Sequence, residues 1–174
     1  MLKILCIVNG ELEENCYIVH NGKDALIIDP GSDGERIEGE INKHKLNVSG
    51  ILVTHHHFDH IGALDYVKSI YKDAIFVDYK HKNVIKGFDY SIIENFGHTM
   101  DSVSFYFKNE KVMFTGDFVF KETIGNYDYF NEDKMIESLR KFTLLDRNIT
   151  IYPGHGDKST VGYEIDNNPY LRGF

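Results

Sequence analysis

The pattern of hydrophobic and polar positions in the first half of the chain predicts short strands with helices between them. Apolar runs and period-two alternation indicate strands, whereas apolar residues recurring every three or four positions indicate helices. Asn21-Gly22 is a strong signal for a two-residue hairpin turn. By these criteria we expect strands over residues 2–8, 16–20, 25–29, 50–53, 74–77 and 91–93, and helices over 37–46 and 61–70.

The second half continues with a hairpin, a helix and a last strand. Residues 102–107 alternate as a strand should, Asn109-Glu110 turns the chain, and residues 111–115 return as the partner strand. An apolar stripe predicts a helix over 135–145, for which Asn131 is a suitable N-terminal cap. The last expected strand covers 149–152, so that Asp117 and His155 each follow the end of a strand.

The size and composition of the chain fit a single compact domain over residues 1–174. The sequence is 42% hydrophobic and 13% aromatic, which is enough to bury a sizeable core. The formal net charge of -8, with only 19 Lys and Arg, argues against nucleic acid as a partner, because nucleic-acid binders concentrate basic residues on one face.

The N-terminal segment and the cysteines bear on where the protein is located. The first apolar run ends at Asn9-Gly10 and is too short for a secretion signal or a membrane span. We therefore expect a cytoplasmic protein without membrane association. Cys6 and Cys16 are the only cysteines and lie in strand-like segments, so that buried free thiols are expected rather than a disulfide. The oligomeric state is left open.

A dense group of potential metal ligands follows the apolar run of residues 50–53. Alternate residues of a loop project to the same side, so His55 and His57 can chelate one cation. Asp59 and His60, past the bend, face a neighbouring cation. A purely structural role is hard to sustain, because burying several imidazoles and a carboxylate without a cation costs free energy for every unsatisfied group.

Each of the two ions needs further ligands, and the sequence offers His98, Asp117 and His155. All three stand beside glycine, which lets the backbone approach a crowded centre, and all three are expected in loops at strand ends, the usual place for functional residues. Taken singly, each could have an ordinary structural role. The need of the cluster for more ligands singles them out.

The remaining histidines are expected outside the metal ligands. His20, His44 and His81 lack any ligand-type spacing and fit exposed or hydrogen-bonded histidines. His56 alternates with His55 and His57, so its ring points away from them. We expect it to support the ligands or to lie exposed.

These motifs resemble those of a known family. The segment Thr54-His55-His56-His57-Phe58-Asp59-His60 is similar to the Thr-His-x-His-x-Asp-His signature of the metallo-β-lactamase superfamily. Later motifs of that superfamily resemble Gly97-His98-Thr99, Thr115-Gly116-Asp117 and Pro153-Gly154-His155-Gly156, in the expected order. The compact glyoxalase II-like hydrolases of the superfamily show further similarity at Asn15-Cys16-Tyr17, Ile28-Asp29-Pro30-Gly31, Ile124-Gly125 and Asn168-Pro169-Tyr170.

The resemblance implies a fold, a ligand set and an activity. The implied fold is α/β, a four-layer αββα sandwich of two mixed β-sheets flanked by helices. The implied ligands are His55, His57 and His98 for one metal and Asp59, His60 and His155 for the other, with Asp117 bridging both. The implied activity is that of a hydroxyacylglutathione hydrolase-like thioesterase.

Two departures from the glyoxalase II pattern leave the thiol part of a thioester substrate open. Full glyoxalase II enzymes bind glutathione through basic residues of a helical C-terminal domain, whereas this sequence ends at Phe174. Compact relatives commonly carry Gly-Arg-x-Asp where this chain has Gly125-Asn126-Tyr127-Asp128. An amide thus replaces an expected guanidinium.

The expected mechanism follows from the metal chemistry. The pKa of a water shared by two divalent cations falls from about 15.7 towards about 7, which yields hydroxide at neutral pH. This metal-bridging hydroxide would attack an ester or thioester carbonyl polarised by one metal. Asp59 and Asp117 would hold the ions and orient the nucleophile. Candidate substrate contacts, with a solvated-loop role as the alternative, are Lys121, Tyr127 and Tyr129.

The ligand types do not select one metal or one reaction. Five imidazoles and two carboxylates suit zinc, iron or manganese, and zinc is the default. Iron would favour a non-haem iron oxidoreductase similar to persulfide dioxygenases. A lactonase or another hydrolase of the superfamily is also compatible with these ligands, as is a domain that binds metal without turnover. The acidic balance of the chain disfavours a nuclease.

Overall fold

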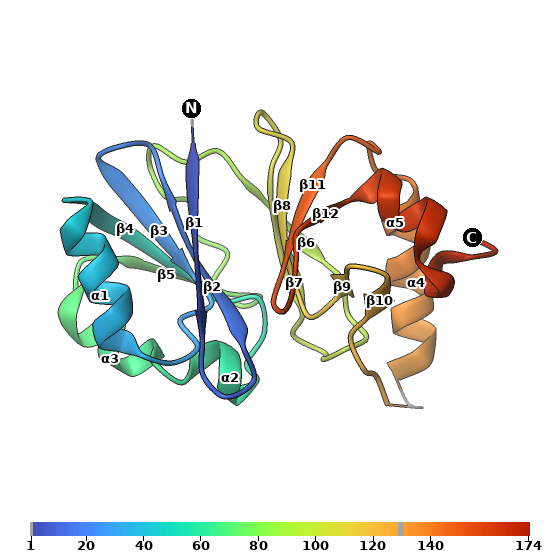
Figure 1. Cartoon of the computed structure of the whole chain (residues 1–174), viewed down its shortest axis with the longest axis horizontal. Helices are drawn as coiled ribbons and strands as arrows, with labels where there is room; N and C mark the ends of the chain where they lie inside the picture. The colour runs from blue at the N-terminus through green and yellow to red at the C-terminus, as the bar shows by residue number, and fades with distance from the viewer. Residues whose placement is uncertain (1, 129–130) are drawn as a thin grey trace. The chain divides into compact units, whose positions relative to one another are not determined.

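The computed structural model describes residues 2–128 and 131–174, which divide into two compact units, Met1–Asp89 and Tyr90–Phe174 (Figure 1). Each unit contains one five-stranded sheet and its own helices, and each is described below by itself. The single domain expected over 1–174 stays a prediction. Among the described residues, no helix has the length and hydrophobicity of a membrane span.

The first unit is built on a mixed sheet with the strand order β1-β2-β3-β4-β5. β1 pairs antiparallel with β2 and β2 with β3, whereas β3, β4 and β5 run parallel. The parallel strands therefore end at one edge of the sheet. In chain order the elements are β1 (Lys3–Asn9), β2 (Glu14–His20), β3 (Asp24–Ile28), α1 (Gly34–Lys43), β4 (Asn47–Leu52), α2 (Phe58–Ile61), α3 (Leu64–Ile70) and β5 (Ile75–Val77).

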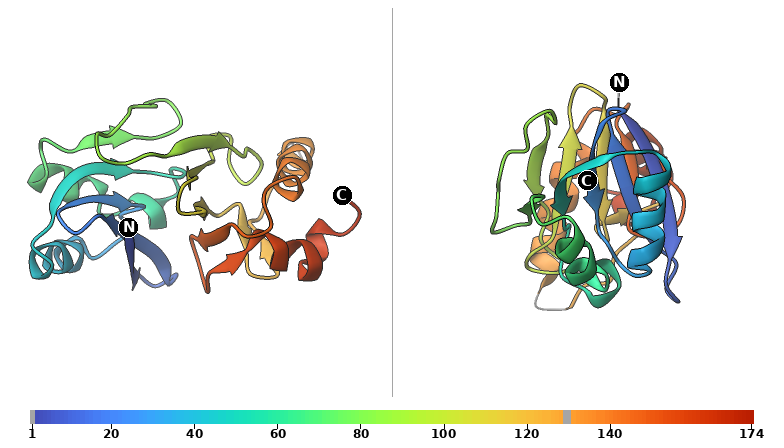
Figure 2. Two further views of the ribbon diagram at one scale, coloured as in Figure 1. Left: turned by 90° about the horizontal axis from the view of Figure 1, so that it is seen from above. Right: turned by 90° about the vertical axis from the view of Figure 1, so that its left-hand side faces the viewer.

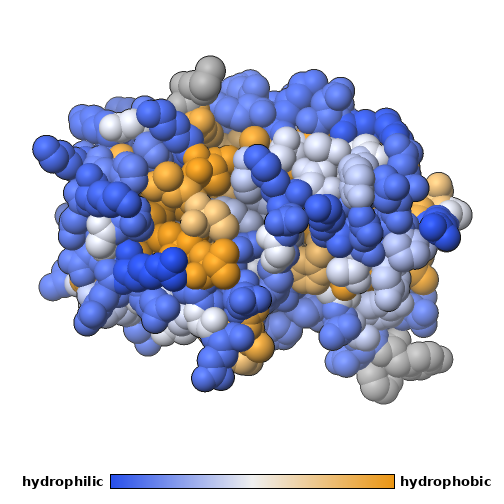
Figure 3. Space-filling model, viewed as in Figure 1, coloured by the Kyte–Doolittle hydropathy of each residue, from blue (hydrophilic) through white to orange (hydrophobic). Residues whose placement is uncertain are grey.

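The core of the first unit lies between this sheet and the helices α1 and α3. Ile37 and Ile41 of α1 and Val67 of α3 are buried with sheet residues such as Ile18 and Ile27. The 3–4 spacing of the α1 residues places them on one helix face, as the sequence predicts. Figure 2 shows α1 and α3 on the same side of the sheet, and Figure 3 shows apolar residues between α1 and β1 amid a hydrophilic surface.

The second unit is built on a mixed sheet with the strand order β12-β11-β8-β7-β6, and β9 and β10 form a separate hairpin. β11 pairs parallel with β8, while the other pairs are antiparallel. In chain order the elements are β6 (Ser91–Glu94), β7 (Val103–Phe107), β8 (Val112–Gly116), β9 (Val119–Phe120), β10 (Thr123–Ile124), α4 (Glu132–Thr143), β11 (Thr150–Pro153), β12 (Ser159–Thr160), α5 (Val161–Asn167) and the 3-10 helix η2 (Pro169–Leu171).

Helix α4 covers the core of the second unit. Met135, Leu139 and Phe142 of α4 are buried together with Phe118 and Ile151. The observed elements confirm two mixed β-sheets with accompanying helices, which the sequence and the resemblance predict.

Three details differ from the expectations. The helix expected over 61–70 is two helices, α2 and α3, with Gly62 between them, where a Cβ would lie 2.2 Å from the carbonyl oxygen of Gly31. The turn after β2 covers residues 21–23, and the side chain of Asn21 accepts hydrogen bonds from the backbone N–H groups of Lys23 and Asp24. Both cysteines are free, but Cys6 is exposed, since it alternates with the core-facing Leu5 and Ile7 on the edge strand β1.

Candidate metal centre

The ligand-bearing segment of the first unit begins where the parallel strands β3 and β4 end. Asp29 follows β3 and Thr54 follows β4, and these strands are paired up to Ile28 and Leu52. The backbone N–H of Asp29 donates to the carbonyl of Leu52, 2.9 Å away. Asp29 then adopts a left-handed conformation with φ 51°, a region in which Asp and Asn are several-fold enriched among non-glycine residues. The turn aims its carboxylate at the segment after β4.

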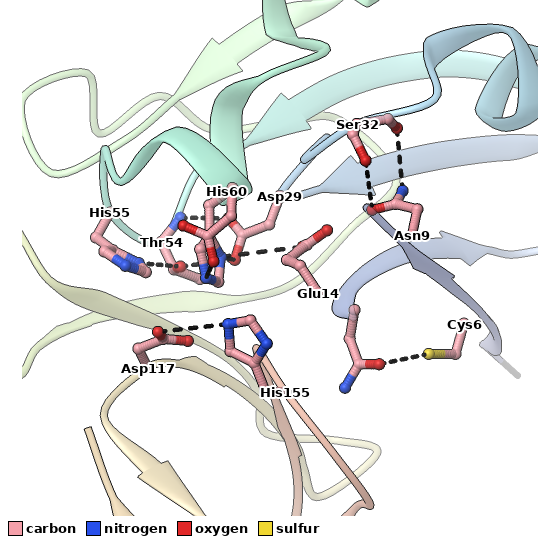
Figure 4. Close-up of polar contacts among 12 residues, drawn as sticks. Cys6, Asn9, Glu14, Asp29, Ser32, Thr54, His55, His60, Asp117 and His155 are labelled. Atoms are coloured by element: carbon pink, nitrogen blue, oxygen red, sulfur yellow. Dashed lines mark hydrogen bonds and ion pairs between the residues drawn. The ribbon is translucent and has the colours of Figure 1, made fainter. Parts of the chain in front are cut away.

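The carboxylate of Asp29 fixes this segment with both of its oxygens (Figure 4). Its Oδ1 accepts a hydrogen bond from the backbone N–H of Thr54 at 2.7 Å, and its Oδ2 accepts one from the Thr54 hydroxyl at 2.6 Å. The same Oδ2 lies 3.0 Å from Nδ1 of His60. All three residues are buried, so these charge-assisted bonds are strong.

Asp29 also decides which nitrogen of His60 can act as a ligand. A carboxylate only accepts hydrogen bonds, so Nδ1 carries the proton and Nε2 presents its lone pair. That Nε2 lies 3.7 Å from Oδ2 of Asp59. Two ligand atoms about 2.1 Å from a tetrahedral ion lie about 3.4 Å apart, so Asp59 and His60 are spaced to share one cation.

His55 and His57 form the second pair of the segment. Their ring centroids lie 4.7 Å apart in an edge-on arrangement. Nδ1 of His55 lies 3.2 Å from the Thr54 hydroxyl, which makes Nε2 its ligand atom. His57 precedes α2 in an extended conformation and turns the chain into that helix. The structure thus brings together all four expected ligands of this segment.

A second buried carboxylate, Glu14 of β2, stands beside His60. Its Oε1 lies 3.9 Å from Nδ1 of His60, and its side chain is 1% exposed. Ligand atoms of Glu14, Asp29 and His60 all lie within 4.8 Å of one another. Gly31 makes room for this carboxylate, since a Cβ there would lie 2.2 Å from Oε2 of Glu14. Glu14 is not among the site residues that the sequence motifs indicate.

Cys16, which lies near the Glu14 carboxylate, has an unreactive thiol. Burial raises the pKa of the Cys16 thiol well above its ordinary value, and the negative charge of Glu14 raises it further. A protonated buried thiol is neither a nucleophile nor a metal ligand. The chemistry of this region therefore belongs to imidazoles and carboxylates.

His56 contacts a different carboxylate from that of its ligand neighbours. Its Nε2 lies 3.4 Å from Oδ2 of Asp78, which follows β5. Oδ1 of Asp78 accepts hydrogen bonds from the backbone N–H groups of Lys80 and His81 and from Nδ1 of His81. Burial opposes ionisation of Asp78, but these bonds prevail and lower its pKa. The Asp78 carboxylate thus ties the His56 side of the loop to the end of β5.

In the second unit, His98 is positioned by helix α4 and by the loop around Gly125. Gly97 packs so closely on α4 that a Cβ would lie 2.6 Å from Cα of Met135. Nδ1 of His98 donates to the carbonyl oxygen of Asn126 at 2.6 Å, so its Nε2 presents the lone pair. A Cβ on Gly125 would lie 1.8 Å from the carbonyl oxygen of Asp117, which explains the glycine there.

Asp117 and His155 follow the parallel strands β8 and β11, as expected. The N–H of Gly154 donates to the carbonyl of Gly116 at 2.9 Å, which holds the two strand ends together. Oδ2 of Asp117 lies 3.6 Å from Nε2 of His98 and 3.6 Å from Nε2 of His155. Figure 4 shows the contact between Asp117 and His155. One carboxylate oxygen therefore faces two imidazole ligand atoms at metal-ligand spacing.

The three residues expected to contact the substrate lie in different environments. Nζ of Lys121 lies 3.2 Å from Oδ2 of Asp157, an exposed ion pair. Tyr127 is 38% exposed in a loop. Tyr129 lies outside the described residues. Contact of these side chains with a substrate stays a prediction.

The donor set of both units fits divalent metal ions. Asp29 and the carbonyl of Asn126 bind the Nδ1 atoms of His60 and His98, so that Nε2 is the presented ligand atom in each. Such outer-shell bonds are the usual support of metal-binding histidines. Three carboxylate-imidazole distances of 3.6–3.7 Å match ligands of a shared cation.

Comparison with known proteins shows which family the chain belongs to. A family model described as the Metallo-beta-lactamase superfamily matches residues 9–96 and 83–155. The chain is 31% identical to the hydroxyacylglutathione hydrolase GloC of Haemophilus influenzae, over 91% of this chain and 93% of that protein.

Two solved structures extend this similarity to the fold. The BLEG-1 B3 metallo-beta-lactamase is 28% identical with a TM-score of 0.91, covering 98% of this chain and all of that one. TTHA1623 in a di-iron-bound form is 26% identical with a TM-score of 0.84, covering 96% of this chain and all of that one. The chain therefore belongs to the metallo-β-lactamase superfamily of metal-dependent hydrolases.

Proposed function

We propose that this protein is a binuclear metallohydrolase that cleaves thioesters or related esters. The observation that carries the proposal is the position of Oδ2 of Asp117, 3.6 Å from the ligand nitrogens of both His98 and His155. A carboxylate oxygen shared by two imidazoles in this way suits a bridge between two cations.

The proposed ligand set divides seven side chains between two ions. Asp59 and His60 belong to the same ion, which agrees with their 3.7 Å separation. Asp117 would bridge the two ions, since its carboxylate lies near His98, a ligand of the first ion, and near His155, a ligand of the second. The first ion would take His55, His57 and His98, and the second Asp59, His60 and His155.

The catalytic roles follow from this division. Two divalent cations, when bound, supply Lewis acidity that lowers the pKa of water and polarises a carbonyl oxygen. Asp59 and Asp117 hold charge at the centre and orient the attacking water. The proton on Nδ1 of His60 stays hydrogen-bonded to Asp29, so this imidazole acts as a ligand and not as a general base.

The thioester class is supported by the 31% identity to a hydroxyacylglutathione hydrolase over nearly the whole of both chains. The substrate would be a small acyl compound, which needs neither nucleic acid nor a membrane. A cytoplasmic location fits this role.

The test is turnover by the purified protein loaded in turn with zinc, iron and manganese, over a panel of thioesters, esters and lactones. Hydrolysis of thioesters supports the proposal. Bound metal without turnover of any compound would instead identify a metal-binding domain without catalysis. Asp117→Asn should lower both metal content and activity at least tenfold, because it removes the shared charge. Asp146→Asn, which alters an exposed carboxylate of the same unit, is the matched control.

A second candidate is an iron oxidoreductase. It is favoured by one observation, namely that a structure 26% identical to this chain is of a di-iron-bound form. Elemental analysis of the protein as isolated separates the two candidates. Iron together with oxygen consumption on glutathione persulfide would replace the hydrolase proposal, whereas zinc and thioester cleavage would retain it.

A further inference from the structure

A hollow of about 460 Å³ opens in the first unit beside the metal-ligand segment. It lies between the turn that joins β1 to β2, the segment that leads into α1, and the start of α2. Its lining includes Glu11, Leu12, Gly31, Asp33, Phe58 and Asp59. Because Asp59 is an expected metal ligand and lines it directly, a group held in this hollow would lie next to the reacting carbonyl.

The walls of the hollow carry large apolar side chains that are exposed to water. Phe58 is 75% exposed and Leu12 is 53% exposed, although the two belong to segments far apart in the sequence. An apolar ligand that covered both would remove this surface from water. Exposed apolar side chains in a concave site are the usual lining of a small-molecule pocket.

The floor of the hollow is formed by closely packed backbone at two glycines, and hydrogen bonds hold two of its walls together. A Cβ on Gly31 would lie 2.0 Å from the carbonyl oxygen of Asp59, and one on Gly62 would lie 2.2 Å from that of Gly31. Nδ2 of Asn9 donates to the carbonyl of Ser32 at 3.1 Å, and the Ser32 hydroxyl lies 3.5 Å from Oδ1 of Asn9 (Figure 4). These bonds join the end of β1 to the segment before α1, so two walls are held together.

The ionisable side chains that line the hollow are all carboxyl groups. Four carboxylates line it, and none of the described lining residues is Lys or Arg. Arg36 lines a neighbouring hollow, which shares Ser32, Asp33 and Gly62 with this one, and its guanidinium is held by a hydrogen bond of 2.7 Å to the carbonyl of Val8. With Asp59 bound to a metal ion, Glu11 and Asp33 are the exposed carboxylates that would repel an anionic ligand group, and they would not repel an uncharged or cationic one. The four carboxylates are those of Glu11, Glu14, Asp33 and Asp59.

We propose that this hollow binds one substituent of the substrate carbonyl, and that it selects an apolar group whose end is uncharged or cationic over an anionic one. The inference rests on the proposed hydrolase function and names its substrate class. It predicts that a thiol with free carboxylates, such as glutathione, is a poor partner on that side of the carbonyl.

Two series of thioesters test the proposal, each with one charge varied. In the first, hexanoyl esters of thiocholine, N-acetylcysteamine and 3-mercaptopropionate place a positive, neutral or negative end on the thiol. In the second series, N-acetylcysteamine esters of 6-trimethylammoniohexanoate, hexanoate and adipate place the positive, neutral or negative end on the acyl chain. In at least one series, kcat/KM should fall in the order cationic, neutral, anionic.

Matched variants assign the preference to this hollow. Glu11→Gln and Asp33→Asn should each lower the cationic-to-neutral ratio of kcat/KM about threefold at low salt, the Coulomb effect of one charge about 6 Å away in water. Glu13→Gln changes an exposed carboxylate of the same turn that does not line the hollow, and should leave the ratio unchanged.

A second pair of variants tests the apolar wall. Leu12→Ala should raise KM for the hexanoyl esters about fivefold with kcat unchanged. Leu144→Ala, at an 86% exposed leucine of the second unit, should leave KM unchanged.

A binding measurement keeps this proposal separate from the hydrolase proposal. Thioether analogues of the same series cannot be hydrolysed, and their binding to the full chain can be followed by the NMR shifts of the Gly10 and Gly31 amides. Tighter binding of the cationic and neutral analogues supports the hollow even if no thioester turns over. Equal or tighter binding of the anionic analogues, or ratios that Glu11→Gln and Asp33→Asn leave unchanged, would overturn it.

Discussion

Asp29→Asn tests how far one buried carboxylate outside the ligand set controls the metal centre. Asn tolerates the left-handed backbone of this position, so the change isolates the loss of an oxygen. In either orientation of the amide, its NH₂ group faces one of two N–H donors, the backbone of Thr54 or Nδ1 of His60. Either the backbone bond breaks or the proton of His60 moves to Nε2, the proposed ligand atom.

The magnitude follows from the bonds that are lost. Three hydrogen bonds reach the carboxylate, and each bond to a charged group is worth about 1.5–3 kcal/mol. The amide keeps at least one of them, so the free energy of unfolding should fall by about 3 kcal/mol, which leaves a protein of ordinary stability folded. Loss of an outer-shell partner of a ligand histidine weakens metal binding about 10–100-fold.

The assay is zinc binding by competition with a chelating dye, read for each of two sites. Asp29→Asn should weaken one of them about 10–100-fold, and ¹⁵N NMR should show either the altered His60 tautomer or the loss of the hydrogen bond from the Thr54 amide. Asp33→Asn is the matched control, because Asp33 has the same φ of 51° but its side chain makes no hydrogen bond at the start of α1. Zinc affinities within twofold of the unmodified protein, with the tautomer unchanged, would refute this account.

Two further predictions concern stability. Asp78→Asn should lower the free energy of unfolding by about 1–2 kcal/mol at pH 7. Because the folded pKa of Asp78 is lowered, this difference in stability should be fully present above about pH 4 and should vanish as the pH falls below that value. Urea titrations at several pH values measure the difference, and a constant difference would contradict the prediction. Gly125→Ala should lower the free energy of unfolding by about 3 kcal/mol, because its Cβ would lie 1.8 Å from the carbonyl oxygen of Asp117. Gly39→Ala in α1, whose Cβ would meet no atom within 4 Å, should raise it by about 0.5–1 kcal/mol. Thermal unfolding of both variants measures the contrast, and a loss of similar size in both would disprove the packing argument.

The fold was predictable where periodicity and turn signals agreed. The strands around Ile18, Ile27 and Leu52 and the helix carrying Ile37 lie where the sequence predicts them. The short elements β9, β10, β12, α5 and η2 were not predicted, since segments this short give little or no period to read. The exposure of Cys6 was missed for another reason, because an apolar strand does not reveal that it lies at a sheet edge.

The sequence indicates the candidate ligands but not the residues that support them. His55, His57, Asp59 and His60 stand in one short segment, so their chemistry is visible in the sequence. Asp29 carried a usable signal, since an Asp-Pro-Gly turn closes a predicted strand. Its use required knowing that β3 pairs parallel with β4, which brings the two strand ends to one edge.

Glu14 and Asn126 show what only tertiary structure decides. Glu14 lies in a strand whose residues are all buried, and nothing in its neighbours indicates that its carboxylate lies beside His60. Asn126 acts through its backbone carbonyl, which the identity of a side chain does not encode. The sequence by itself determined the residue types, and thus the candidate ligands and the resemblance to the superfamily. The structure decided which nitrogen of His60 and of His98 is presented, because these tautomers are set by hydrogen bonds between segments that folding alone brings together.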